Sequence, residues 1–458
     1  MGIGDRRKSL DSIRNLAATR QLERTLGPWQ LAGIGIGAII GMGIYTLTGI
    51  GAGNAGPAVI LSFAIAGVIC AAAALAYAEL ASLMPVAGSA YTYSYVVLGE
   101  LAAWIVGWSL FLEYALACSA VAVGWSAYFA GLMRSIGWDI DAQWLAGPGN
   151  GGTFNAPAAA VSLAVALLLT LGTRESARLN TILVAVKVVA LCTFVVFALR
   201  GFDAGNLAPF APFGTTGVLT AAALVFFAFF GFDAVSTAAE EARNPGRDMK
   251  FGIVGSMLVC TLLYMVVALA AVGALRWDLF AGNAEPLAHV LRSTGYATVA
   301  NIVATAAICA TPSVLMSLMF GQTRVTFAMT RDGLLPRRLA AVHPRFRTPH
   351  VITLATGVVV AVVAGGFRLD EIAALANAGT LCAFVAAAAA MLVLRRREPG
   401  LERTFSCPAP WLVGPVAIVG CVGLFFYLGT TTLLFFIAWH VAGLAWYFGI
   451  GRQQSHMA

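Results

Sequence analysis

Long apolar stretches alternate with short charged segments along almost the whole chain. The stretches at 351–366 and 380–394, for example, contain no charged residue. A helix needs about 20 mostly apolar residues to cross a bilayer, and in lipid only helices or closed barrels satisfy the backbone. The pattern predicts an all-α polytopic membrane protein of about twelve transmembrane helices, at 28–52, 57–83, 98–130, 157–173, 177–199, 216–241, 250–275, 296–330, 350–367, 370–394, 411–429 and 431–449.

The composition supports lipid as the solvent. Hydrophobic residues make up 60% of the chain and charged residues only 11%, against about 25% charged residues in soluble domains. Two segments are expected not to cross. Residues 277–295 are short and interrupted by Pro286, which suits a re-entrant or lid helix. Residues 334–342 are expected to lie along the inner surface as an amphipathic helix.

Basic residues are distributed very unevenly between the two sides. With the N-terminus inside, 22 of the 28 Lys and Arg residues fall on the inner side, 5 fall outside, and Lys187 lies within a span. This asymmetry follows the positive-inside rule. It predicts a multi-pass protein of the plasma membrane (the inner membrane in a bacterium) with both termini in the cytoplasm. The basic clusters then lie beside anionic lipid and do not indicate nucleic-acid binding.

Several other kinds of chemistry lack their motifs. The chain has no paired CxxC and no HExxH, and no lysine follows a glycine as a Walker A motif requires. The five histidines lie in loops or near the C-terminal end. We therefore expect no enzyme activity, no metal, no cofactor and no use of ATP. A channel would need a continuous polar path, for which these helices are too apolar.

The first expected span is unusually rich in glycine, with five glycines between Gly33 and Gly43. Each glycine weakens a helix by about 1 kcal/mol relative to alanine. Gly33, Gly37 and Gly41 repeat every four residues, which is typical of close helix contacts in membranes. Alternatively, the helix unwinds at Gly41, Met42 and Gly43, and the freed N–H groups hold an anion such as a carboxylate. Both interpretations hold if Gly33 and Gly37 pack against a neighbouring helix while Gly41 and Gly43 bind the anion.

The sixth expected span contains a counterpart. Aligning 38–41 with 228–231 places Gly231 on Gly41 and the first span on the sixth. Five spans separate the two, so the second copy is inverted in the membrane. A pair of glycine-interrupted spans in two inverted halves indicates a transporter site near the bilayer midplane.

Ionisable residues within spans need an explanation, because each costs about 3 kcal/mol or more at a helix centre. Glu113 lies midway along the third span and Lys187 lies in the fifth. They are either a structural ion pair or functional groups. If they are functional, Lys187 couples transport to protons, because burial disfavours its charged form. Glu113 would then face the substrate's amino group or stabilise the same network. Asp233 follows the break at Gly231. For Glu79, and for Glu240 and Glu241, a solvated or capping role is expected.

An ordered set of motifs resembles the amino acid–polyamine–organocation permeases, and most closely their cationic amino acid transporter branch. The resemblance covers most of the chain. It implies the leucine-transporter fold, in which two inverted five-helix repeats at 28–200 and 216–395 are followed by two helices at 411–449. Residues 1–27 and 450–458 would be cytoplasmic. The motifs lie at 24–30, 35–45, 76–80, 85–91, 230–233, 241–245 and 324–336.

The resemblance also implies a binding site. The backbone at Gly41, Met42 and Gly43 would hold the substrate carboxylate, and carbonyls around three residues would hold its amine: Ile39, Ile40 and Phe230. Phe226 and Phe232 are expected to cover the site, and Lys187 would stand where sodium-coupled relatives bind sodium. Thr311 is expected to line the pocket, beside a Pro312 that departs from the family pattern.

The sequence thus predicts a secondary transporter that moves cationic or small neutral amino acids by alternating access, coupled to protons. Its expected partners are the amino acid, protons and membrane lipids. Substrate exchange, polyamine transport and a sensor without transport remain alternatives. The sequence does not determine an accessory subunit.

Overall fold

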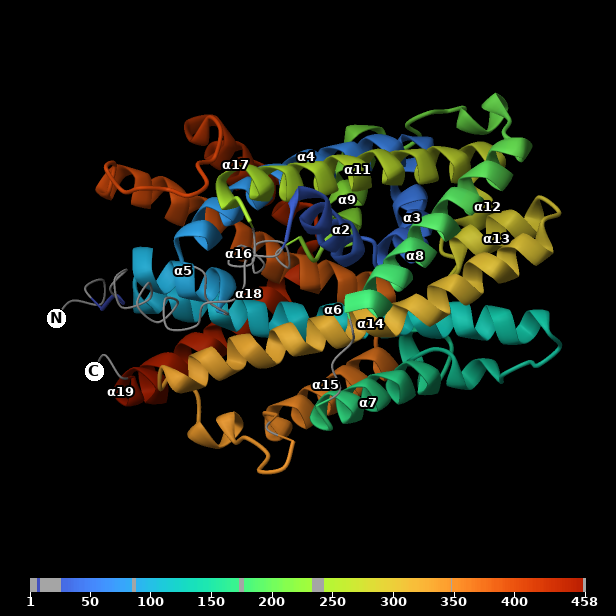
Figure 1. The fold of residues 1–458 in the computed structure, drawn as a ribbon. Coiled ribbons are helices and arrows are strands. Elements are labelled where there is room, and N and C mark those ends of the chain that lie inside the picture. The colour runs from blue at the N-terminus through green and yellow to red at the C-terminus, as the bar shows by residue number, and fades with distance from the viewer. Residues whose placement is uncertain are drawn as a thin grey trace.

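The computed structural model describes residues 6–8, 26–84, 88–172, 177–232, 243–346 and 348–455. Within these ranges the elements are all helical, and several of the long helices run in nearly the same direction (Figure 1). Asp233, Glu240 and Glu241 lie outside the described residues, as does the motif segment at 85–87. The expected all-helical architecture, with several helices that can cross a membrane, is confirmed.

Each of the twelve expected spans overlaps a helix or a broken helix. By length and composition, seven helical stretches of the described residues can cross a membrane, and four shorter apolar helices accompany them. The helices at the expected spans are α2 (Pro28–Ile39), α3 (Met42–Ala55), α4 (Val59–Leu83), α6 (Glu100–Ser135), α7 (Ala156–Thr170), α8 (Ala177–Ala198), α9 (Gly214–Val225), α11 (Pro245–Ala274), α14 (Ala297–Arg331), α15 (His350–Gly366), α16 (Leu369–Arg397), α17 (Pro410–Phe426) and α18 (Thr430–Trp446).

Short helices lie between these elements or after the last of them. They are α5 (Ser89–Val97), α12 (Trp277–Phe280), α13 (Pro286–Ser293) and α19 (Arg452–Gln454). The expected lid segment at 277–295 contains α12 and α13. The amphipathic helix expected at 334–342 is wrong, because only a 3₁₀ turn forms at Arg337–Ala340. Leu334 and Leu335 are buried, and the turn ends at Ala341, which is extended with φ −61° and ψ 121°, so no longer helix forms there.

The order of short and long helices is similar before and after residue 200. The helices α6 and α14, of 36 and 35 residues, pack along each other, and α7 packs on α15 (Figure 1). Short helices precede α6 and α14 alike. Glycines allow such close contacts: a Cβ added at Gly357 of α15 would lie 2.3 Å from the Ala166 side chain of α7.

Residues 6–8 and Ser455 lie at the same end of the molecule, here called the terminal face (Figure 1). Two buried carboxylates hold both chain ends there. Glu100 accepts hydrogen bonds from Tyr95, Tyr447 and Ser455 and lies 3.5 Å from Arg6, and Asp332 accepts from Lys8 and Tyr91.

Glu79, at the end of α4, is a third buried carboxylate on this face. The solvated or capping role expected for it is wrong, because its side chain is only 1% exposed. It pairs with Arg395 and Arg403 and accepts a hydrogen bond from the Cys407 N–H at 2.7 Å. A buried carboxylate persists only with such partners.

On the opposite face (Figure 1), a buried carboxylate, Glu285, immediately precedes α13. It pairs with Arg292 at 2.6 Å, and it lies so close to α6 that a Cβ added at Gly131 would collide with it. Burial raises the pKa of Glu285, and the hydrogen bond and charge of Arg292 oppose this shift only in part.

Candidate functional site

The first expected span is broken in the middle. The helix α2 ends at Ile39, and Ile40 has ψ 86° while Gly41 is extended. The next helix, α3, begins at Met42. The non-helical residues thus lie slightly earlier than the expected 41–43, and Met42 and Gly43 form the first turn of α3. The N–H groups of a first turn have no acceptor within the helix and carry its positive end.

The side chain of Lys187 reaches the end of α2, where the break leaves the Gly37 carbonyl without its partner in the helix. In a continuous helix the Gly41 N–H would donate to Gly37, but it donates instead to Ile39 at 2.8 Å. The ammonium of Lys187, on α8, donates to the Gly37 carbonyl at 3.2 Å. The side chain is 3% exposed. A cation at the C-terminal end of a helix is favourable, so Lys187 caps α2.

A second break follows α9. The helix tightens into a 3₁₀ turn at Phe226–Phe229, Phe230 is extended, and Gly231 has φ +104°. A positive φ of this size favours glycine. A Cβ at Gly231 would also lie 2.5 Å from the Ala38 oxygen of α2. Both conditions explain why glycine occupies this position.

The two breaks contact each other directly. Besides the approach of Gly231 to Ala38, Gly43 lies against the turn after α9, where an added Cβ would be 2.7 Å from the Ala228 Cα. The hydroxyl of Tyr264, on α11, lies 2.9 Å from the Ile39 oxygen and 3.0 Å from the Ala228 oxygen. One side chain therefore bridges both broken segments.

Part of each break is accessible. Gly41, Phe230 and Gly231 are partly exposed, whereas Ile39 and Ile40 are buried. The breaks thus present backbone atoms and the Phe230 ring to a small molecule, while the helix segments beside them are packed. This arrangement suits a ligand with separate anionic and cationic groups, because a helix N-terminus and helix C-termini meet here.

The three expected phenylalanines do not lie together. Phe230 packs edge-on against Tyr114 of α6, with ring centroids 6.0 Å apart. Phe226 and Phe232 are buried and pack against Phe384 of α16, at 5.8 and 4.9 Å. Only Phe230 is therefore partly accessible at the break.

Thr311 lies close to the first break. Its hydroxyl donates to the Ala307 carbonyl one turn earlier and lies 3.8 Å from the Met42 sulfur. Glu113, in contrast, is buried against α16, where a Cβ added at Gly379 would be 2.9 Å from the Glu113 Cβ. Lys187 and Glu113 thus face different helices, α2 and α16.

The glycines of α2 differ in their surroundings. A Cβ at Gly37 would lie 2.2 Å from Val184 of α8, so Gly37 packs closely, as expected. Among the described residues nothing lies within 4 Å of the Cβ position at Gly33, so none of them provides the packing contact expected for Gly33. A Cβ at Gly41 would meet Val314 of α14 at 3.5 Å, an ordinary contact.

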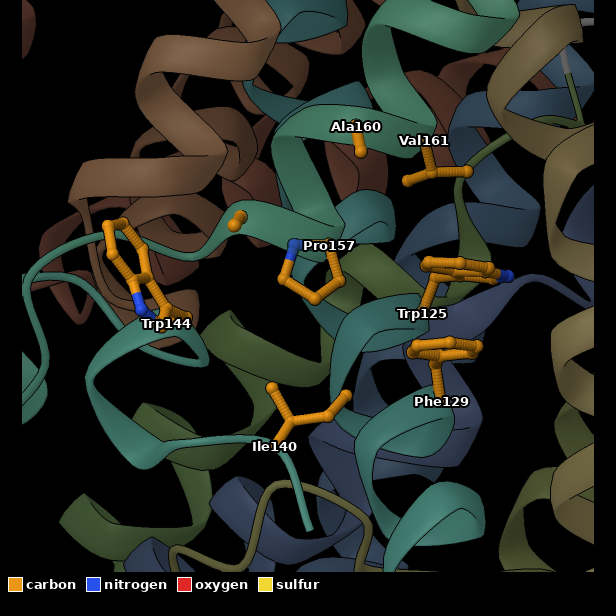
Figure 2. Close-up of a pocket in the computed structure, with 8 residues that line it drawn as sticks. Trp125, Phe129, Ile140, Trp144, Pro157, Ala160 and Val161 are labelled. Atoms are coloured by element: carbon orange, nitrogen blue, oxygen red, sulfur yellow. The ribbon is translucent and has the colours of Figure 1, made fainter. Parts of the chain in front are cut away.

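The helix α14 continues through Pro312 because a side chain replaces the lost bond. Proline has no N–H, so the Ile308 carbonyl loses its partner within the helix. The Trp125 indole N–H donates to this carbonyl at 3.0 Å. Figure 2 shows Trp125 stacked on Phe129 in an apolar pocket of about 450 Å³. None of the expected site residues lines this pocket.

Tyr264, Tyr114 and Trp125 were not singled out from the sequence. Tyr264 lies in an apolar span, where a tyrosine that must pair its hydroxyl is a weak signal. Trp125 could have been sought as the partner of Pro312, but the sequence does not show which helix faces that carbonyl. Among the described residues, no group of three His, Cys, Asp or Glu side chains could hold a metal ion.

The fold is that of a polytopic helical protein, and the two breaks form its candidate site for a small molecule. A sequence profile described as amino acid permease matches residues 26–450, and the chain belongs to this family. The predicted relationship to the amino acid–polyamine–organocation permeases is thereby confirmed. The chain is a membrane permease and not an enzyme.

Three relatives illustrate the range of this family. The chain is 45% identical to the branched-chain amino acid permease BcaP of Bacillus subtilis (strain 168), over 99% of this chain and 98% of the relative. It is 41% identical to the methylthioribose transporter of the same organism, over 98% of both. It is 34% identical to the cationic amino acid transporter 4 of Homo sapiens, over 89% of this chain and 65% of the relative.

Proposed function

We propose that this permease moves neutral amino acids with apolar side chains across the membrane by alternating access. The observation that carries the proposal is the contact between the two breaks, at Ile40–Gly41 and at Phe230–Gly231. In this proposal the chain has the leucine-transporter fold, with twelve crossings, inverted repeats at 28–200 and 216–395, and two further helices. The similar order of helices in the two halves, and the packing of α6 on α14, support the repeat.

The substrate carboxylate is assigned to the N-terminus of α3, at Gly41, Met42 and Gly43. Its ammonium is assigned to carbonyls around Ile39, Ile40 and Phe230. The partly accessible Phe230 ring and the Val314 side chain would then contact the substrate side chain. Apolar neighbours favour a neutral side chain over a cationic one. The name of the relative BcaP, a branched-chain amino acid permease, supports the same substrate class.

Lys187 is assigned to proton coupling. Its ammonium caps the carbonyl that the first break frees, so loss of its proton would weaken α2 at the site itself. Substrate and proton would in this way bias the same broken helix. The terminal face is assigned to the cytoplasmic side of the plasma membrane. It carries Arg6, Lys8, Arg395 and Arg403, in agreement with the positive-inside distribution.

The test is uptake of radiolabelled leucine, alanine, arginine and methylthioribose into proteoliposomes, with and without an inward proton gradient. We expect leucine uptake that the gradient stimulates, and little uptake of arginine. Uptake only into liposomes preloaded with amino acid would identify an exchanger. Absence of both net and exchange uptake of every amino acid would contradict the proposal, and methylthioribose uptake alone would replace the substrate class.

A further inference from the structure

Two carbonyl oxygens share one hydroxyl group between the breaks. Ile39 is the last residue of α2, and Ala228 belongs to the 3₁₀ turn after α9. The Tyr264 hydroxyl lies 2.9 Å and 3.0 Å from their oxygens. A phenol hydroxyl has a single proton, so Tyr264 donates a strong hydrogen bond to only one of the two carbonyls at a time.

The aromatic ring of Tyr264 has little freedom to move. The side chain is fully buried, and it packs on Phe63 of α4 and on Phe229, with ring centroids 5.8 and 5.2 Å apart. A change of acceptor therefore requires only a rotation of the hydroxyl proton. The oxygen stays between the two segments in either state.

The two acceptors differ in what else they bind. The Ile39 carbonyl already accepts the Gly41 N–H at 2.8 Å. A carbonyl oxygen has two lone pairs, so Ile39 is saturated while Tyr264 donates to it. An ammonium group that needs the Ile39 carbonyl can bind it only after the Tyr264 proton has turned to Ala228.

We propose that the Tyr264 hydroxyl takes the place of the substrate ammonium at the Ile39 carbonyl when the site is empty, and turns to Ala228 when an amino acid binds. Tyr264 is then a positioning residue that keeps the broken helices joined in the empty permease. This inference rests on the proposed function. It assigns Tyr264 to the step in which the empty permease returns, which net uptake requires and exchange does not.

The test is Tyr264→Phe, which keeps the buried ring and removes only the hydroxyl. Net leucine uptake should fall about three- to tenfold, the equivalent of one intramolecular hydrogen bond. Exchange into leucine-loaded liposomes should fall clearly less, because in the loaded permease the substrate ammonium itself occupies the Ile39 carbonyl.

Tyr128→Phe is the matched control. Tyr128 is also fully buried, and its hydroxyl donates to the Tyr45 carbonyl of α3 at 2.8 Å, outside the breaks. This variant should leave the ratio of net uptake to exchange as in the wild type. A Tyr264→Phe protein that lowers both modes by the same factor, or changes neither, would overturn the proposal.

A second variant covers poor folding of Tyr264→Phe. An ester in place of the peptide bond between Ile39 and Ile40 makes the Ile39 carbonyl a weaker acceptor and leaves Tyr264 intact; the ester also removes the Ile40 N–H, which donates to the Ile36 carbonyl at 2.9 Å, so the ratio of net uptake to exchange is the readout. It should lower net uptake relative to exchange, and an unchanged ratio would overturn the proposal. Failure of the proposed function itself would be distinct, because the wild type would then show neither net uptake nor exchange of amino acids.

Discussion

The ammonium of Lys187 donates a hydrogen bond to the Gly37 carbonyl oxygen at 3.2 Å, between residues 150 positions apart in the chain. This carbonyl is free only because α2 breaks one turn later, where the Gly41 N–H turns to Ile39. The cation is therefore placed by the break, and its proton acts on the same helix that would bind the substrate.

Lys187→Met should remove this link. We expect leucine uptake in the variant to lose its stimulation by a proton gradient. The free energy of unfolding should fall by about 1–3 kcal/mol, because the buried Gly37 carbonyl loses a partner. The measurements are initial uptake rates at several external pH values and thermal unfolding in detergent. Arg200→Met, which removes an exposed cation after the end of α8, is the control. Retained gradient stimulation in Lys187→Met would refute the coupling role.

Gly43→Ala should separate the two breaks. The added methyl would lie 2.7 Å from the Ala228 Cα, and this neighbour is backbone that cannot turn aside. We expect loss of leucine binding by at least about tenfold, equivalent to 1.4 kcal/mol of strain at the contact. Leucine-induced thermal stabilisation measures the loss. Gly33→Ala is the matched control, since none of the described residues lies within 4 Å of its Cβ position. Equal affinity of the two variants would show that the contact is not needed.

The sequence predicted the features that leave a local pattern. The apolar runs placed the helices, because a bilayer dictates their length. The glycines around Gly41 and Gly231 indicated both breaks, because few other residues tolerate a positive φ or a close backbone contact. The family followed from motifs that span the chain.

Other features depend on which distant groups meet, and no local pattern encodes them. Glu79 ends a span, as a solvated residue would, but Arg395 and Arg403 reach it from more than 300 residues away. Tyr264 is 225 residues from Ile39. Gly33 fits the spacing of a packing glycine, yet among the described residues α8 approaches closely at Gly37 and not at Gly33.

Glu285→Gln should change how stability depends on pH. Burial raises the pKa of Glu285 above its ordinary value of about 4.3. Between these two pKa values the folded state binds more protons than the unfolded state, so this carboxyl makes stability fall as pH rises. The Tm of the wild type should decline over that window, and the variant should decline less. Asp139→Asn, an exposed acid on the same face, is the control. Parallel Tm profiles for wild type and Glu285→Gln would contradict the prediction.

Trp125 and Pro312 should be coupled energetically. Trp125→Phe keeps an aromatic ring beside Phe129 but leaves the Ile308 carbonyl without its donor. The free energy of unfolding should fall by about 1–3 kcal/mol, which is the cost of an unsatisfied buried polar group. In a Pro312→Ala background, residue 312 regains an N–H that can donate to Ile308 within α14, so the same Trp125→Phe change should cost clearly less. A double-mutant cycle on thermal unfolding measures the difference, which we expect to be about 0.5–3 kcal/mol for such contacting residues. Additive effects would mean that the indole does not compensate for the proline, and that α14 tolerates Pro312 through its packing alone.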